Sequence, residues 1–527
     1  MKEFDMMKFP ELRHIATILL AVLLFASCED YNDLDTGVVE TDQVDMTTYA
    51  AVGNSLTAGL QSGALYESAQ EFSFPALVAR AAKVNDFEQP MVSDPGIGGL
   101  IQITDIIQGS ITRAPADEGQ PLNAGLNRPY NNLGIPGALT ADYLNADGNL
   151  LSRSQSNPFY ELVLRSALQD PATANIHSQL EALQPTLVSF YLGNNDILQY
   201  ATSGGIAPFT APSQFQNDYS QAINAVNSLD SSPAILVYTI PDVTTIPFLT
   251  SVGPQLSSDL MEQGVPQIVV QKSFVEGNPL FPEGNSDPVE QISTSELENP
   301  DESLVTQTAQ DILPLIGTSA ADPSAPDDAV ESIQQVWIDL LLSAGAISEA
   351  EAEALAENQE QLEQTLDQFL IGQYEQTFGS AQAQAFASSW NDETNDVGPY
   401  DFDQPFALSP DNPMHNQFVL DGDEITISNN VVSSYNSTIQ AQSATIIDAN
   451  GIFADIVSAG SITVNGVTLA PEIGSFFSFD GVHPSSRGYA LLAKETIEIL
   501  KTELGAEELR DIDISEVPQG IPVVNEN

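Results

Sequence analysis

Three apolar runs of strand length stop abruptly at turn-forming residues, and this pattern constrains the fold more than any other feature of the chain. The runs cover 49–52, 186–192 and 234–240, and they end at Gly53-Asn54-Ser55, Gly193-Asn194-Asn195-Asp196 and Pro241-Asp242. Such runs are typical of buried parallel strands, and the helical segments between them favour a layered α/β fold. We therefore predict a three-layer α/β/α fold with a mainly parallel sheet.

The α/β pattern is interrupted by a long segment, 251–415. It contains Pro-rich and acidic loops together with blocks at 329–344 and 348–390 whose Ala, Glu and Gln content favours helix. Since this segment falls between two pieces of the sheet pattern, we predict a large, mostly helical insertion and consider it a candidate cap over the site.

The remaining segments follow from local patterns. We expect helices over 74–82, 158–170, 427–441, 452–457 and 486–500, a strand over 444–448, and a hairpin over 462–469 with Asn465-Gly466 at its turn. The predicted order is a signal peptide (1–27), an acidic tether (28–45), a first core part (46–250), the insertion (251–415), a second core part (416–505) and a weakly ordered tail (506–527).

The first residues have the pattern of an export signal. Three basic residues precede an apolar stretch over 15–25 that is too short to span a bilayer stably, and small residues lead to Cys28, the only cysteine. This arrangement resembles a bacterial lipobox, and the acidic run after it resembles the surface-export signal of Bacteroidetes lipoproteins. The resemblance implies lipidation at Cys28 and an outer-membrane anchor at the cell surface. The alternative is a plain secretory signal with an incidental cysteine.

The chain is strongly acidic, with 14 basic residues, 73 acidic residues and a net charge of −59. Nucleic-acid binding is disfavoured because phosphate backbones are bound by Lys and Arg, and anionic lipid surfaces would be repelled. Salt screens such self-repulsion, so a salt-loving source is one hypothesis and an ordinary acidic secreted protein is the other.

One serine and one histidine stand out as candidates for chemistry. Ser55 follows a strand end, where α/β proteins bind their ligands, but a serine hydroxyl needs a base to become nucleophilic. His483 has Asp480 three residues before it, a spacing that lets the carboxylate reach Nδ1 while Nε2 faces outward. The histidines at 14, 177 and 415 lack comparable context. The alternative for Asp480 and His483 is a simple helix-capping turn.

Acyl transfer also needs donors for a developing oxyanion, each worth roughly 3 to 4 kcal/mol in measured cases. The loops at strand ends offer the N–H groups of Ser55 and Gly137 and the side-chain amide of Asn195. Each of these could equally be an ordinary turn residue.

Read in order, these pieces resemble the SGNH (GDSL-like) hydrolase family. The matching blocks are Gly53-Asn54-Ser55-Leu56, Gly137, Gly193-Asn194-Asn195-Asp196 and Asp480-Gly481-Val482-His483, within 46–250 and 416–503. The resemblance implies that Ser55 is the nucleophile, Gly137 and Asn195 complete the oxyanion hole with Ser55, His483 is the base and Asp480 orients it. Two departures are Asn54 in place of the usual Asp and the long span to His483. Gly134 competes with Gly137 for the second block.

The resemblance implies a flavodoxin-like sheet. It also implies a serine ester hydrolase that needs no cofactor or metal and acts on an acyl lipid or an acetylated glycan. The α/β-hydrolase fold is a weaker match because Thr57 occupies the second glycine position of its Gly-x-Ser-x-Gly motif. The competing functional class is a catalytically silent lipoprotein that binds glycan or lipid on the same fold. Nothing in the sequence indicates a particular oligomeric state, so we make no prediction about it.

Overall fold

The computed structural model describes residues 44–105, 110–144, 157–165, 175–272, 289–321, 327–343, 345–378 and 399–522, with isolated positions between 38 and 41 and between 380 and 388. The predicted signal peptide and Cys28 lie outside these residues. None of the helices in the described part combines the length and the apolar character needed to cross a bilayer.

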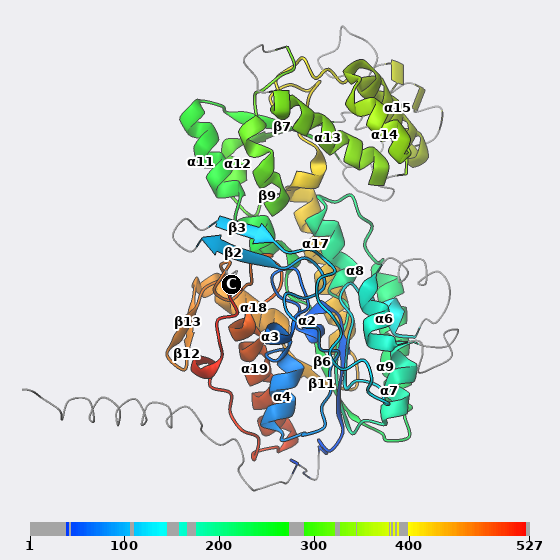
Figure 1. The fold of residues 1–527 in the computed structure, drawn as a ribbon, viewed down its shortest axis with the longest axis vertical. Coiled ribbons are helices and arrows are strands. Elements are labelled where there is room, and N and C mark those ends of the chain that lie inside the picture. The colour runs from blue at the N-terminus through cyan, green and yellow to red at the C-terminus, as the bar shows by residue number, and fades with distance from the viewer. Residues whose placement is uncertain are drawn as a thin grey trace, which may run out of the picture. The chain divides into compact units, whose positions relative to one another are not determined.

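A five-stranded sheet forms the centre of the fold (Figure 1). Its strands are β1 (Tyr49–Gly53), β4 (Asn132–Gly134), β5 (Leu187–Tyr191), β6 (Ala234–Tyr238) and β11 (Thr445–Ile447). They lie in the order β11-β6-β5-β1-β4, and every neighbouring pair is parallel. In chain order this is the flavodoxin-like arrangement, in which the crevice between the first and third strands is the usual ligand site. The predicted fold class is confirmed.

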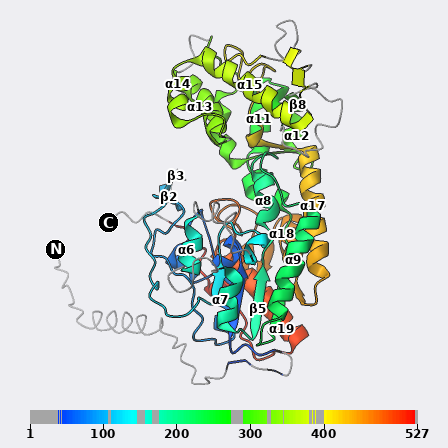
Figure 2. The ribbon, with the colours of Figure 1, turned by 90° about the vertical axis from the view of Figure 1, so that its right-hand side faces the viewer.

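Neighbouring residues of β5 show how the two faces of the sheet are covered. Phe190 packs edge-on against Tyr143 and Tyr219, whereas Tyr191 stacks on Tyr238 and contacts Phe74 on the opposite face. This alternation follows from the pleat of a strand. Helices α4 (Phe74–Ala81) and α19 (Ser486–Leu504) cover the tyrosine face, and α7 (Ile176–Leu183), α9 (Pro212–Asn227) and α17 (Gly422–Gln440) cover the other face (Figure 2).

Shorter elements surround the sheet. They are α2 (Ser55–Ala58), α3 (Glu67–Gln70), β2 (Ile101–Asp105), β3 (Ser110–Arg113), η1 (Thr140–Tyr143), α6 (Pro158–Leu164), α8 (Asn195–Thr202), η3 (Val243–Thr245), α10 (Pro247–Thr250), η6 (Asn416–Phe418), β10 (Val419–Asp421), α18 (Ala449–Ala459), β12 (Ile462–Val464), β13 (Val467–Leu469) and η7 (Ile514–Glu516). The predicted hairpin is confirmed as β12 and β13, with positive φ at Asn465 and Gly466 as a type I′ turn requires.

Residues 251–415 have their own apolar core, which includes Trp337, Leu341, Leu362 and Leu366. The elements are α11 (Gly253–Gln263), β7 (Gln267–Gln271), β8 (Val289–Ser293), α12 (Thr294–Glu298), β9 (Ser303–Val305), η4 (Gln307–Asp311), η5 (Leu313–Leu315), α13 (Asp327–Ser343), α14 (Glu349–Ala356) and α15 (Gln359–Phe378). The helical blocks thus appear where expected. The antiparallel pairs β7–β8 and β9–β10 were not predicted from the sequence.

The tail differs from the prediction. Ala506, Leu509 and Ile514 are buried, and Arg487 Nε donates a hydrogen bond to the carbonyl of Val517 at 3.0 Å. The expectation of weak order after Gly505 is therefore wrong for 506–522, because spaced apolar residues anchor this segment. Residues 523–527 lie outside the described residues.

Two other segments are more extensive than predicted. Val39 and Val44 are buried, so packed structure begins inside the predicted tether. Helix α17 starts at Gly422 rather than at 427, because Asp421 Oδ1 accepts the N–H groups of Asp423 and Glu424 at 3.0 Å each. Such a capping interaction moves the start of a helix ahead of its apolar periodicity.

Candidate active site

Ser55 lies where β1 ends and α2 begins. The Asn54 side chain caps this turn by accepting the Leu56 N–H at 3.0 Å. At Gly53 a Cβ atom would lie 1.9 Å from Thr57 Oγ1, so the tight turn requires glycine at this position. Ser55 is 7% exposed, so the residue is largely shielded from solvent.

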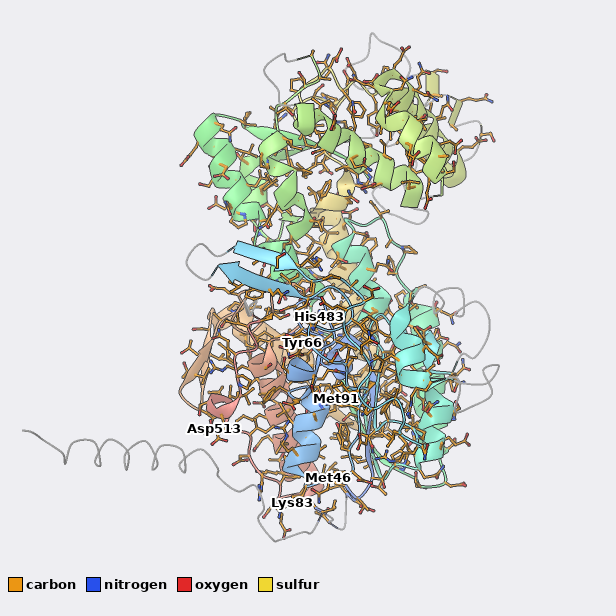
Figure 3. The ribbon with its side chains drawn as sticks, in the orientation of Figure 1. Met46, Tyr66, Lys83, Met91, His483 and Asp513 are labelled. Carbon is orange, nitrogen blue, oxygen red and sulfur yellow. The ribbon has the colours of Figure 1, made fainter. Side chains whose placement is uncertain are left out.

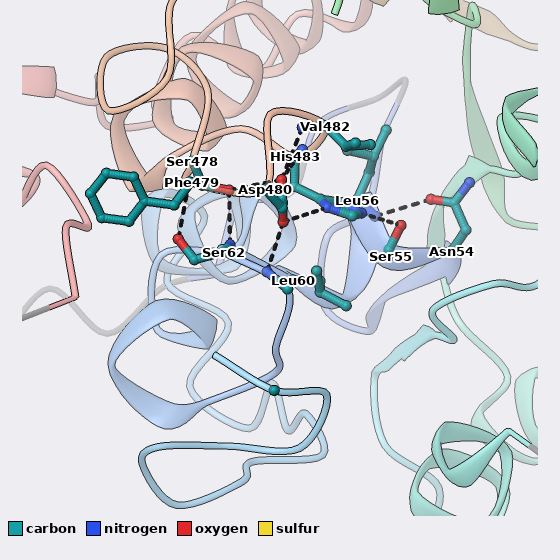
Figure 4. A network of polar contacts seen from close by, with 12 residues as sticks. Asn54, Ser55, Leu56, Leu60, Ser62, Ser478, Phe479, Asp480, Val482 and His483 are labelled. Atoms are coloured by element: carbon teal, nitrogen blue, oxygen red, sulfur yellow. Dashed lines mark hydrogen bonds and ion pairs between the residues drawn. The ribbon is translucent and has the colours of Figure 1, made fainter. Parts of the chain in front are cut away.

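His483 connects the serine to a carboxylate (Figure 4). Its Nε2 lies 2.9 Å from Ser55 Oγ, and its Nδ1 lies 2.9 Å from Asp480 Oδ2. A carboxylate next to Nδ1 fixes the ring proton there, which leaves the Nε2 lone pair directed at the serine hydroxyl. Figure 3 locates His483 among the other described side chains. The structure thus brings together three residues that the sequence analysis predicted.

Asp480 is held in its ionised form. Burial alone raises the pKa of Asp480, but the charge of His483 and hydrogen bonds from the His483 ring, the His483 N–H and the Val482 N–H outweigh burial and lower the pKa to about 2. The two N–H groups donate to Oδ1 at 2.8 and 2.9 Å. The carboxylate therefore stays negative over the pH range in which a histidine acts as a base.

The other described histidines serve packing. His415 is 2% exposed, contacts the Trp337 ring edge-on, and accepts the Gln417 N–H at Nδ1, while burial lowers the pKa of its imidazole to about 3. His177 Nδ1 lies 2.9 Å from the Tyr143 hydroxyl. Neither residue lines a cavity with Ser55.

The predicted oxyanion donors lie at the ends of neighbouring strands. Asn195 Nδ2 donates one hydrogen bond to the Ala138 carbonyl at 2.9 Å, and its amide has a second N–H for a ligand. Gly137 has φ +81°, which favours glycine. Among the residues that the structure describes, no acceptor is hydrogen-bonded to the backbone N–H of Ser55 or Gly137.

The structure favours Gly137 over Gly134 as the glycine of the second block. Gly134 lies inside β4 opposite Gly53, and its N–H donates to Asn132 Oδ1 at 2.9 Å. A Cβ atom at Gly134 would also lie 2.4 Å from the Ala58 nitrogen. Gly134 is therefore needed for close packing against α2, and its N–H is not available to a ligand.

Two cavities border these residues. One, partly open to solvent, is lined by Ser55, Leu56, Asn194, Asn195, Leu198, Pro241, Asp242, Val243, Ile246, Phe453, Val482 and His483. The other is lined by Gly137, Leu139, Asp142, Asn157, Tyr160, Asn195, Leu198, Gln199 and Thr202. The cavity next to Ser55 and His483 is mainly apolar, whereas the lining of the second is divided about equally between polar and apolar surface. They share Asn195 and Leu198.

Asn54, which departs from the family pattern, has a clear structural role. Besides capping α2, it donates from Nδ2 to Asn194 Oδ1 at 3.0 Å, and both residues are buried. An aspartate at this position could not donate that bond, because an ionised carboxylate only accepts. Asn54 therefore links the turn after β1 to the turn after β5 across the crevice.

Asp196 supports the oxyanion loops, a role that the sequence analysis did not assign. Its Oδ2 accepts the N–H and the hydroxyl of Thr140 at 2.9 and 3.0 Å, which ties the loop after β4 to the start of α8. Burial raises the pKa of Asp196 to about 6 against the opposing effect of the Thr140 hydrogen bonds. The sequence signal for this role was the position of Asp196 directly after Asn195, at the end of Gly193-Asn194-Asn195-Asp196.

Comparison with known proteins agrees with this geometry. The profile of the GDSL-like Lipase/Acylhydrolase family matches residues 49–331, from the first residue of β1 to the beginning of α13. The match contains Ser55, Gly137 and Asn195, and ends before Asp480 and His483. No curated protein and no solved structure matched the chain. Since the match covers more than half of the sequence, the chain belongs to the GDSL-like lipase/acylhydrolase family of hydrolases.

Proposed function

We propose that this protein is a serine ester hydrolase that works through a covalent acyl-enzyme on Ser55. The observation that carries the proposal is the continuous contact from Ser55 Oγ through His483 to Asp480, with both links at 2.9 Å. Ser55 and His483 lie 428 positions apart in the chain, so no local turn explains their contact. A buried serine, an oriented imidazole and an ionised carboxylate form the arrangement that activates a hydroxyl.

In the proposed mechanism, Ser55 Oγ attacks the ester carbonyl carbon while His483 Nε2 takes the hydroxyl proton. The negative charge that develops on the carbonyl oxygen is stabilised by the N–H groups of Ser55 and Gly137 and the amide of Asn195. His483 then gives its proton to the leaving alcohol. Water repeats the sequence on the acyl-enzyme, releases the acid and restores Ser55, while Asp480 remains ionised throughout.

The cavity beside the triad supports an apolar acyl group as part of the substrate. Most of its lining is hydrocarbon, including Leu56, Val243, Ile246 and Phe453. Transfer of an acyl chain from water to such a surface is favourable by about 25 cal/mol per Å². The adjoining cavity, about half of whose lining is polar, offers hydroxyl, amide and carboxylate groups for a hydroxylated alcohol such as glycerol or a sugar.

The proposal includes an N-terminal lipid anchor that holds the enzyme at the outer surface of the outer membrane. Its support is the sequence around Cys28, with an apolar stretch and small residues before it and an acidic run after it. Metabolic labelling with an alkyne fatty acid should label the full chain and not the Cys28→Ala variant. Equal labelling of both would contradict lipidation at this position.

The catalytic proposal is tested with protein that begins after Cys28. We expect it to hydrolyse p-nitrophenyl butyrate and the Ser55→Ala variant to lose this activity. Ser458→Ala is a matched control, because Ser458 is exposed on α18 and its hydroxyl contacts only the Asp455 carbonyl among described residues. Equal rates for wild type and Ser55→Ala would reject the enzyme and leave a binding protein on the same fold.

A further inference from the structure

Two buried serines connect the segment after the proposed nucleophile to the turn that bears the proposed base. The Ser62 N–H donates to Ser478 Oγ at 2.8 Å, and the Phe479 N–H donates to Ser62 Oγ at 3.2 Å (Figure 4). Ser62 is 0% exposed and Ser478 is 3% exposed. The two bonds are reciprocal and join chain segments more than four hundred residues apart.

The chain of hydrogen bonds continues from Ser478 to the carboxylate of Asp480. Because Ser478 Oγ accepts the Ser62 N–H, its own proton is available for Asp480 Oδ1, which lies 3.2 Å away. Hydrogen bonds in such a chain polarise one another and strengthen cooperatively. The Gly63 N–H donates at 2.8 Å to Asp480 Oδ2, the oxygen that also contacts His483 Nδ1.

The backbone at these positions fits this role. Ser62 has φ +51° and Gly63 has φ +82°, so two successive residues adopt the left-handed conformation. Such a turn presents consecutive N–H groups to one side and forms a concave site for an anion. A non-glycine residue is uncommon at positive φ. Here the Ser62 hydroxyl, which accepts the Phe479 N–H, gives a physical reason for serine at a position where glycine would be easier to accommodate.

We propose that Ser62 and Ser478 are positioning residues, which fasten the Asp480–His483 turn to the segment that follows Ser55 and so aim His483 Nε2 at the serine hydroxyl. The inference rests on the proposed function. The carboxylate receives hydrogen bonds from Ser478, Gly63, Val482 and His483, and these leave it little freedom to rotate. Without the serine link, the carboxylate and the imidazole gain freedom while the substrate cavities keep their lining.

The test compares Ser478→Ala and Ser62→Gly with wild type on p-nitrophenyl butyrate. Glycine suits the positive φ of residue 62 and removes the hydroxymethyl side chain without straining the backbone. We expect kcat to fall roughly 10- to 100-fold in Ser478→Ala, as for a small misplacement of catalytic groups, and less in Ser62→Gly, with KM within twofold of wild type. The rate of Ser55 labelling by a small fluorophosphonate should fall in parallel.

Ser257→Ala is the matched control. Ser257 is 1% exposed and donates a buried hydrogen bond to the Thr294 carbonyl at 2.7 Å, far in sequence from the His483 turn. It should lower the melting temperature and leave kcat per titrated active site unchanged. If both serine variants keep kcat within twofold of wild type, or change only KM, the positioning role is overturned. A wild-type protein without esterase activity would instead overturn the proposed function.

Discussion

The sheet region and the insertion at 251–415 are both well packed, but they relate to the candidate site in different ways. Each catalytic candidate follows a strand of the sheet or precedes α19, and none of the residues that line the cavity beside Ser55 comes from the insertion. The insertion has an apolar core of its own. It approaches the Asp480–His483 turn at Gly481, beside which Gln307 lies. Packing density alone therefore does not identify the functional part of this molecule.

Of the changes that separate the sheet region from the insertion, we expect the largest effect from replacing the carboxylate of Asp480. Asp480→Asn should lower kcat about 10⁴-fold, close to 5 kcal/mol, because an amide favours the wrong imidazole tautomer and does not stabilise the protonated ring. Steady-state kinetics with p-nitrophenyl butyrate measure this effect. A loss below tenfold would mean that Asp480 only stabilises the turn before α19 by accepting the Val482 and His483 N–H groups.

The matched change in the insertion should affect stability and not turnover. Trp337 is 1% exposed and packs against Tyr400 and His415 at ring-centroid distances of 5.2 and 4.9 Å. Trp337→Ala should lower the free energy of unfolding by about 3 to 5 kcal/mol through lost contacts and a cavity. Urea unfolding followed by circular dichroism measures this, and kcat of the folded protein should not change. A parallel tenfold drop in kcat would show that the insertion supports the site.

A third prediction concerns the pH dependence of stability in the sheet region. The pKa of Asp196 rises from 3.8 to about 6 on folding, so the folded state keeps a proton that the unfolded state loses. The raised pKa of Asp196 contributes its whole stabilisation of the folded state below about pH 4, and this contribution is lost as the pH rises from 4 to 6. Above about pH 6 the contribution no longer changes with pH. The decline corresponds to roughly 3 kcal/mol.

Asp196→Asn should remove this decline, because an amide does not titrate and can still accept the Thr140 hydrogen bonds. The measurement is the difference in unfolding free energy between wild type and variant at pH 4, 5, 6 and 7, which cancels the other carboxylates to first order. A difference that does not vary with pH would contradict the assignment.

The smallest expected effect concerns acyl-chain preference. Leu198 lines both cavities and is partly exposed on α8. Leu198→Ala should lower kcat/KM for p-nitrophenyl octanoate by about fivefold, near 1 kcal/mol, and leave the acetate ester unchanged, since only the longer chain reaches that side chain. An equal loss for both esters would indicate a general disturbance of the oxyanion loops.

Local sequence signals predicted the parts of the site that depend on local geometry. Ser55 and Asn195 follow strands whose abrupt ends are visible in the sequence, and Asp480 precedes His483 at a spacing that a single turn closes. The short strand β4 before Gly137 was not predicted. The parallel sheet follows from the same strand ends. Because the carboxyl ends of parallel strands meet at one edge, these signals also predicted that the residues would meet.

The parts that were missed depend on pairing between distant segments. Ser62 and Ser478 have no motif, and their bond is specified only when α19 and β1 are packed on one sheet. In sequence, the tail around Ala506 and Ile514 resembles a polar linker. Only the folded structure shows that these two apolar side chains are buried. Asn54 was recognised as unusual, but its partner Asn194 belongs to another strand end.

The separation of Ser55 from His483 also has a consequence for biosynthesis. Chains emerge from the ribosome from the amino terminus, and their domains fold in that order. The proposed nucleophile is made early, whereas the proposed base follows it by 428 residues. A growing chain therefore carries an unactivated serine until His483 has been synthesised, so the proposed activity begins only when α19, the helix after His483, docks.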